Sequence, residues 1–218
     1  MKKTFMVIGL GRFGSNIAKT LVAMNCDVLA VDIKEESVSA IKSYVPHCVI
    51  ADATKERVLE ELGVKSIDHV VVAIGNNLQS SILTIVNLRH LGVRNITVRA
   101  DEESHKEVYL TLGASDVIIP EETAAISLAN QIVSDSILDY YEVSKGYAIA
   151  KIIISKNYEE NLIELDLRNK YDINIVGLIN EDGDFFIPRG TDKLQKGNIA
   201  VVVGTKQKIK KIDEFFNN

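Results

Sequence analysis

The strongest constraint on the fold is a glycine-rich turn, GLGRFG at residues 9–14, between the apolar run Phe5–Ile8 and a helical pattern. Gly9 suits the tight turn, Gly11 would let the backbone approach a pyrophosphate, and Gly14 allows a helix to pack closely on a strand. The N-terminus of that helix offers free N–H groups and a partial positive charge. The turn therefore predicts a nucleotide-binding loop. The alternative is a glycine turn that serves packing alone.

An acidic residue stands at the expected distance from this turn. Asp32 ends the next apolar run, 18 residues after Gly14, where a carboxylate accepts hydrogen bonds from ribose hydroxyls. A carboxylate there repels a 2′-phosphate, so NADP is disfavoured relative to NAD or an adenosine nucleotide. Lys34 follows two residues later as a further candidate contact. Arg12, inside the turn, is either a solvated surface side chain or a ligand of terminal phosphates.

Short runs rich in Val and Ile alternate with helical patterns through residues 1–120. The strands are expected at Phe5–Ile8, Val28–Val31, Cys48–Ile50, Val70–Ala73, Ile96–Val98 and Val117–Ile119. The helices are expected at Phe13–Met24, Glu35–Ser43, Arg57–Leu62, Leu78–Leu91 and Lys106–Leu112. Strands that are apolar throughout are typical of a sheet covered on both faces. The alternation predicts a Rossmann-like, doubly wound parallel sheet.

Residues 121–143 form the second expected segment, a helix that leaves the first domain and runs from Glu121 to about Tyr141. Apolar side chains recur along it at helical spacing, namely Ala125, Leu128, Ala129, Ile132 and Val133. Such a stripe marks one continuous face of a helix. Two interpretations stay open. The helix packs back on the sheet, or its stripe is exposed and docks a partner.

Residues 144–218 form the third segment, a small α+β module. Strands are expected at Tyr147–Ser155, Asn174–Asn180, Asp184–Ile187 and Asn198–Val203, and a helix at Lys206–Phe216. Gly183 lies in a hairpin turn where a positive φ is favoured. Because about 75 residues approach the lower size limit for an independent core, pairing with a second copy is favoured.

Candidate site residues follow the expected strands, and ligands of such sheets bind at the carboxyl ends of the strands. The polar or turn-forming residues at those ends are Asp52, Ala53, Thr54, Ile74, Gly75, Asn76, Asn77, Arg99 and Glu121. Each alone also suits an ordinary loop or helix cap, as Thr54 and Asn77 would at the starts of helices. Together they would line one crevice.

Composition excludes several classes of function. The formal net charge of −5 and the lack of a basic run disfavour a nucleic-acid partner. No apolar run approaches the ~20 residues of a membrane span, and the N-terminus does not resemble a secretory signal. Cys26 and Cys48 lack metal-type spacing and are expected to be reduced thiols. The chain is therefore expected to be soluble and cytoplasmic.

No constellation of catalytic residues stands out. The four histidines fall in separate elements, and serine-hydrolase, zinc-protease and P-loop motifs are missing from the sequence. Tyr141 and Lys145 have the Tyr-x-x-x-Lys spacing of short-chain dehydrogenases, but chance alone gives such a match often in a chain of this composition. We therefore expect a non-enzyme. An NAD-linked oxidoreductase and an NAD(H) redox sensor remain the alternatives.

The whole chain resembles the KtrA-type regulatory subunits of Trk/Ktr bacterial potassium uptake systems, which carry an RCK domain and an RCK_C companion. The stretches that carry the resemblance are Val7–Gly14, Leu29–Asp32, Val72–Gly75 and Gly113–Glu121. The resemblance implies homodimers that assemble into an octameric ring. The ring would dock on the cytoplasmic face of an integral-membrane potassium transporter subunit and remain peripheral to the membrane.

The resemblance also implies ligands. ATP and ADP, or NAD(H) in relatives, would compete for the crevice and change the shape of the ring. The residues implied to contact nucleotide are Gly9, Gly11, Arg12, Phe13, Gly14, Asp32, Lys34, Asp52, Ala53, Thr54, Ile74, Gly75, Asn76, Arg99 and Glu121. Glu121 would also help to bind a divalent cation, Mg²⁺ or Ca²⁺, near the ATP phosphates at a subunit interface. Ala51 departs from the Gly of many relatives, which leaves the nucleotide preference open.

In Gram-positive relatives the C-terminal modules pair and bind cyclic di-AMP between them. The corresponding positions here are Ile163, Arg168, Asn174, Ile175 and Pro188. Arg168 would face a phosphate, Asn174 a base edge, and the apolar residues would sandwich purines. The alternative is a dimer core without a ligand.

Overall fold

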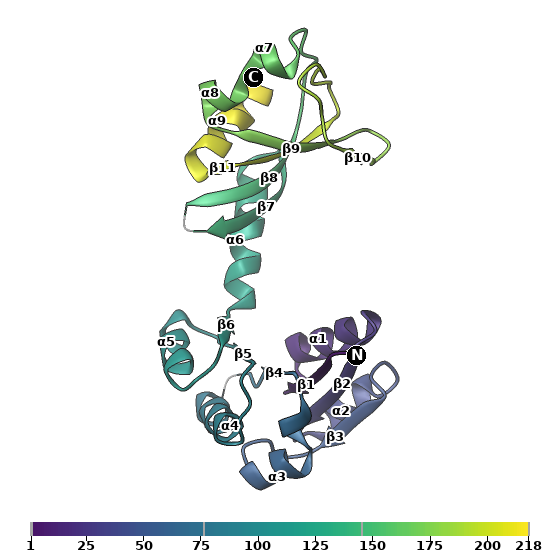
Figure 1. Ribbon diagram of the computed structural model, residues 1–218, viewed down its shortest axis with the longest axis vertical. Coiled ribbons are helices and arrows are strands. Elements are labelled where there is room, and N and C mark those ends of the chain that lie inside the picture. The colour runs from purple at the N-terminus through teal and green to yellow at the C-terminus, as the bar shows by residue number, and fades with distance from the viewer. Residues whose placement is uncertain (1, 76, 145, 218) are drawn as a thin grey trace. The chain divides into compact units, whose positions relative to one another are not determined.

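The computed structural model describes residues 2–75, 77–144 and 146–217 (Figure 1). The chain divides into two compact units, residues 1–121 and residues 122–218. Each unit has its own sheet and its own hydrophobic core.

The first unit is built on a six-stranded parallel sheet of order β3-β2-β1-β4-β5-β6. Its strands are β1 (Thr4–Ile8), β2 (Asp27–Asp32), β3 (His47–Ile50), β4 (His69–Val72), β5 (Ile96–Arg99) and β6 (Asp116–Ile118). This order confirms the predicted Rossmann-like sheet. The strand order reverses between β1 and β4, which is the point where doubly wound sheets open to a ligand.

Helices cover both faces of this sheet. They are α1 (Arg12–Ala23), α2 (Glu35–Ile41), α3 (Glu56–Glu61), α4 (Leu78–His90) and α5 (Glu103–Thr111), with a 3₁₀ turn, η1, at Val64–Ser66. On one face Ala18 and Ile41, from α1 and α2, are buried against the strands. On the other face Leu59, Leu88 and Tyr109, from α3, α4 and α5, fill a second core. Both faces of the sheet are therefore buried from solvent, as the uninterrupted apolar strands predicted.

The second unit holds a five-stranded antiparallel sheet of order β10-β9-β11-β8-β7. Its strands are β7 (Ile137–Ser144), β8 (Tyr147–Ile153), β9 (Asn174–Ile179), β10 (Phe185–Phe186) and β11 (Ile199–Thr205). The helices are α6 (Pro120–Val133), whose first two residues belong to the first unit, α7 (Leu162–Leu165), α8 (Leu167–Tyr171) and α9 (Lys206–Asn217). Ile212 and Phe216 of α9 are buried against Ala150 and Val202 of the sheet. The α+β prediction is therefore confirmed.

The helix expected over residues 121–143 is wrong in its second half. The helix α6 ends at Val133, and Ile137–Ser144 instead forms β7, an edge strand paired with β8. The turn between them is held by Asp213 of α9, whose carboxylate accepts hydrogen bonds from the hydroxyls of Ser134 and Ser136. That contact joins residues more than 75 positions apart, so no local pattern could indicate it.

Two further details concern α6 and β10. No residue of α6 is buried, and the predicted apolar stripe is exposed, with Ile132 73% and Val133 84% accessible. The strand expected at Asp184–Ile187 contains only Phe185 and Phe186. Gly183 has a φ of +87°, as the hairpin prediction required.

Candidate functional site

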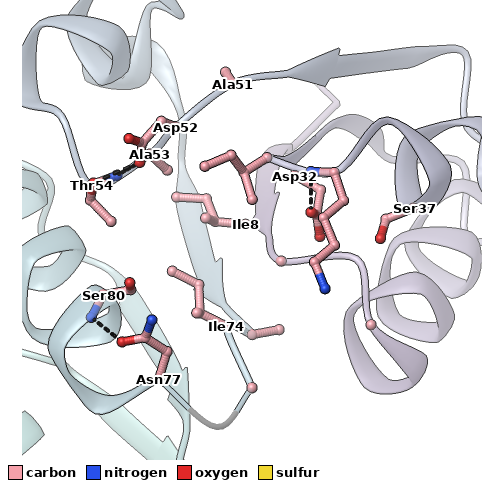
Figure 2. Close-up of a pocket in the computed structure, with 16 residues that line it drawn as sticks. Ile8, Asp32, Ser37, Ala51, Asp52, Ala53, Thr54, Ile74, Asn77 and Ser80 are labelled. Carbon is pink, nitrogen blue, oxygen red and sulfur yellow. Dashed lines mark hydrogen bonds between the residues drawn. The ribbon is translucent and has the colours of Figure 1, made fainter.

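A cavity of about 470 Å³ lies at the carboxyl ends of the central strands of the first unit. Figure 2 shows Asp32 and Ser37 on one side, Asp52, Thr54, Asn77 and Ser80 on the other, and Ile8 and Ile74 between them. The full lining is Ile8, Gly9, Gly11, Asp32, Ile33, Lys34, Ser37, Ala51, Asp52, Ala53, Thr54, Ala73, Ile74, Gly75, Asn77 and Ser80. We call this set the crevice. It lies at the point where the strand order reverses.

Asp32 fixes the glycine-rich turn to the end of β2. One carboxylate oxygen accepts a hydrogen bond from the backbone N–H of Leu10 at 2.6 Å, and the other accepts one from the backbone N–H of Lys34 at 2.8 Å. Each carboxylate oxygen has a second lone pair, so both can still accept a hydrogen bond from a ligand. The carboxylate is thus held in one orientation at the edge of the crevice.

The glycines of the turn serve different purposes. Gly9 has a φ of +91°, and a Cβ built there would lie 2.7 Å from the backbone of Ala73. A Cβ on Gly14 would lie 1.9 Å from the carbonyl oxygen of Gly9, which explains how closely α1 packs against the turn. A Cβ on Gly11, in contrast, would meet nothing within 4 Å. Gly9 and Gly14 are therefore required by the fold, whereas Gly11 leaves open space for a ligand.

The loop after β3 forms the opposite wall. Asp52 accepts hydrogen bonds from the hydroxyl of Thr54 at 2.6 Å and from its backbone N–H at 3.1 Å. The hydroxyl bond is the main cause that holds the pKa of Asp52 below its usual range. Thr54 does not cap the following helix, because the N-cap of α3 is Lys55. Asn77 does cap α4, as predicted, by accepting a hydrogen bond from the N–H of Ser80.

A group of charged side chains lies at the ends of β5 and β6. Arg99 Nη2 lies 2.9 Å from Asp101 and 2.8 Å from Glu121, and its Nε atom is buried with no hydrogen-bond partner among the described residues. Arg99 Nη1 would lie 3.5 Å from a Cβ placed on Gly75, so the guanidinium borders the crevice. The pKa of Glu121 is held below its usual range, mainly by a hydrogen bond from its own backbone N–H. The positive charges of Arg99 and Arg12 lower this pKa further.

The structure brings most of the predicted nucleotide residues to one cavity. Those that line it are Gly9, Gly11, Asp32, Lys34, Asp52, Ala53, Thr54, Ile74 and Gly75. Arg12 begins α1 and is exposed, and Phe13, the next residue of α1, packs against the core. Asn76 lies outside the described residues. Sequence reasoning missed Ile33, Ser37 and Ser80, which have no motif of their own and reach the crevice only because α2 and α4 begin there.

The residues present fit a nucleotide better than a metal ion. The open space at Gly11 and the free lone pairs of Asp32 are what the phosphates and the ribose of a nucleotide require. In the described part of the chain, no group of three or more His, Cys, Asp or Glu side chains could hold a metal. Glu121 is paired with Arg99.

The residues predicted to bind cyclic di-AMP lie in the second unit. Ile163, Arg168 and Asn174 are exposed, and Pro188 is half-buried. The N–H of Ile163 donates to the carbonyl of Gly190, two residues beyond Pro188. Ile175 is half-buried and packs against the core.

Tyr141 of the alternative dehydrogenase motif lies on β7 of the second unit and is 57% exposed. Its partner Lys145 lies outside the described residues. The crevice belongs to the first unit.

Comparison with known proteins identifies the family. A model of the TrkA-N domain matches residues 5–120, and a model of the TrkA-C domain matches residues 160–217. The Ktr system potassium uptake protein C of Bacillus subtilis (strain 168) is 40% identical over 98% of this chain and 97% of its own. The Ktr system potassium uptake protein A of the same organism is 38% identical over 97% and 96%.

Solved structures agree on the fold. The RCK domain of GsuK superimposes with a TM-score of 0.67 at 15% identity, covering all of this chain, which spans 48% of that one. A GsuK channel bound to NAD gives a TM-score of 0.56 at 23% identity, covering 99% of this chain and 39% of that one. At these identities the likeness concerns the fold alone. The two domain matches and the near full-length relatives together show that the chain belongs to the Ktr/Trk family of potassium uptake proteins.

Proposed function

We propose that this protein is a cytoplasmic, nucleotide-gated regulatory subunit of a potassium transporter, with ATP, ADP or NAD(H) as the ligand of the crevice. The observation that carries the proposal is Asp32, whose carboxylate is fixed by two backbone N–H groups at the strand ends with lone pairs still free. The link to potassium rests on the relatives, which are named as Ktr system potassium uptake proteins.

The ligand would lie across the crevice in a defined direction. The ribose hydroxyls would donate to Asp32, and the phosphates would approach Gly11 and the N-terminus of α1. The adenine would lie among the apolar side chains of Ile33, Ala51 and Ala53. Arg12 and Arg99 would attract terminal phosphates. Asp32 would disfavour NADP.

A divalent cation would require more than one chain. Glu121 is the proposed protein ligand, and the remaining oxygens would come from nucleotide phosphates and a neighbouring subunit. Because Glu121 pairs with Arg99 in the single chain, a cation would have to compete with that pair. The cation is therefore proposed as part of an assembled ring.

Assembly is proposed to involve the exposed stripe of α6. Large apolar side chains such as Leu128, Ile132 and Val133 are exposed on a helix that has no buried residue, and exposed apolar surface of this kind marks an interaction site. None of the described helices is both long and apolar enough to cross a bilayer. We propose homodimers in an octameric ring that acts on an integral-membrane potassium transporter subunit.

Gating follows from differential affinity. A nucleotide can shift the ring between two shapes only by as much as it binds one shape more tightly than the other. The γ-phosphate is the group that distinguishes ATP from ADP, and we propose that Arg12, Arg99 and Glu121 lie close enough to recognise it. No catalytic step is proposed. Cyclic di-AMP is proposed as a second ligand, held between paired second units by Arg168 and Asn174.

Ranked thermal shifts test this proposal against its alternatives. The wild-type protein is heated with ATP, ADP, NAD⁺, NADH, NADP⁺ or cyclic di-AMP. A ligand at a hundred times its Kd stabilises the native state by about 2.7 kcal/mol, so shifts of several degrees are expected for ATP and ADP and none for NADP⁺. A shift with NADH alone would instead favour a redox sensor, and turnover of NADH with a carbonyl substrate an oxidoreductase.

A further inference from the structure

The helix α4 buries polar side chains where a helix normally buries apolar ones. Ser81 and Thr84 are 1% and 0% exposed, and they are two of the three buried polar side chains in the described part of the chain. With Asn77, Ser80 and Asn87 they recur every three or four residues, so they lie along one side of the helix. We call these five residues the polar stripe of α4. Buried polar groups are costly unless they form hydrogen bonds.

The hydrogen bonds of the polar stripe reach both loops that line the crevice. Ser81 Oγ lies 3.5 Å from the carbonyl of Ile74, in the loop after β4. Thr84 Oγ1 lies 2.8 Å from the carbonyl of Ser80 and 3.4 Å from that of Ala53, in the loop after β3. The shorter contact takes the single hydroxyl proton of Thr84. Thr84 is therefore satisfied within its own helix, and the long contacts of both side chains hold the two loops only weakly.

Asn87 makes the well-formed bond to the loop after β3. Its Nδ2 donates to the carbonyl of Thr54 at 2.8 Å, across 33 positions of sequence. The bonds between Asp52 and Thr54 fix the shape of that loop internally. They do not fix its place relative to the rest of the sheet. The N–H of Ala51 ties the start of the loop to the carbonyl of Asp32 at 2.9 Å, and Asn87 ties its far end, at Thr54, to a helix that also lines the crevice through Ser80.

We infer that Asn87 is a positioning residue for nucleotide binding: it holds the Asp52–Thr54 wall of the crevice at the distance from Asp32 that an adenosine requires. The inference rests on the proposed nucleotide function. Asn87 itself does not line the crevice, so it acts through the loop and not by contact with the ligand. The loop lies on the adenosine side, whereas the phosphates lie at the glycine turn. Its displacement therefore weakens ATP and ADP by the same factor.

The chain offers a matched control. Asn95 Nδ2 donates to the carbonyl of Asp68 at 2.9 Å, which is the same kind of bond. It lies at the amino ends of β4 and β5, the opposite edge of the sheet from the crevice. Asn95→Ala therefore removes an equivalent bond without touching a crevice loop.

The experiment measures ATP and ADP affinity by calorimetry, together with thermal unfolding, for the wild type, Asn87→Ala, Asn87→Asp and Asn95→Ala. Asn87→Asp keeps the side-chain volume and loses the donor. Both Asn87 variants are expected to bind about tenfold more weakly, with the ATP-to-ADP affinity ratio unchanged within about twofold, since a hydrogen bond contributes roughly this much. Asn95→Ala is expected to bind within about twofold of the wild type. It is also expected to lose some thermal stability, but less than Asn87→Ala, because its bond is more exposed.

The possible results distinguish a failure of the positioning role of Asn87 from a failure of the proposed nucleotide binding. If the wild type binds nucleotide and the Asn87 variants bind as tightly as Asn95→Ala, the inference is overturned and the proposed function stands. If the Asn87 variants change the ATP-to-ADP ratio, the residue acts on phosphate recognition and the inference is also overturned. If the wild type binds no adenine nucleotide, both fall.

Discussion

Replacement of Asp32 by alanine is expected to abolish nucleotide binding, with affinity at least about a hundredfold weaker. Hydrogen bonds to a charged group contribute about 1.5–3 kcal/mol each, and the ribose would lose two of them. The change also frees the backbone N–H of Leu10, which the carboxylate now holds at 2.6 Å. The glycine turn would then lose its anchor to β2. Calorimetric titration with ATP and ADP measures the effect.

Asp27→Ala is the control for this change. Asp27 begins the same strand, β2, but at the end remote from the crevice, where its side chain forms a long, exposed ion pair with Lys2 at 3.8 Å. Such a pair contributes little. Asp27→Ala is expected to bind as the wild type does. An Asp32→Ala variant that keeps its ATP affinity within threefold would show that Asp32 does not recognise the ribose.

Two alanine substitutions in the glycine turn are expected to have opposite effects. Gly14→Ala places a Cβ 1.9 Å from the carbonyl oxygen of Gly9, and overpacking against backbone is costly because the turn and α1 must separate. A loss of about 3 kcal/mol or more in the free energy of unfolding is expected. Gly11→Ala meets no atom within 4 Å and has a φ of −64°, which alanine adopts freely. Its stability is expected to stay within about 0.5 kcal/mol.

Gly11→Ala is expected to weaken nucleotide binding even though it leaves the free energy of unfolding nearly unchanged. The methyl group of Gly11→Ala would occupy the space where the phosphates approach, so nucleotide affinity should fall at least about tenfold in a protein that remains folded. Denaturant unfolding and titration of both variants provide the measurements. If Gly11→Ala binds ATP normally, the phosphates do not lie at this turn. If Gly14→Ala unfolds like the wild type, the close approach of α1 to the turn is not a constraint.

The first unit was predictable because its signals are local. Its strands are three to six residues long and apolar on both faces, and glycines with φ of +71° to +104° follow α3, α4 and α5. Both patterns can be recognised from neighbouring residues alone. The end of α6 was not predictable. Its apolar pattern continues past Val133, and the turn that stops it is fixed by Asp213 far along the chain.

The crevice shows the same division between local and long-range signals. Gly11, Asp32 and the residues after β3 and β4 follow from motif spacing and from the rule that strand ends bind ligands. The polar stripe of α4 does not. Thr84 and Asn87 contact a loop that lies more than 30 positions earlier in the sequence. Only the folded structure shows that these side chains face that loop.

The most direct test of the central claim is small-angle X-ray scattering of the assembled protein, saturated with ATP and then with ADP. Two distinct scattering profiles are expected for the wild type, and a single profile for Asp32→Ala under both conditions. Superimposable ATP and ADP profiles from wild-type protein that has both nucleotides bound would contradict nucleotide gating.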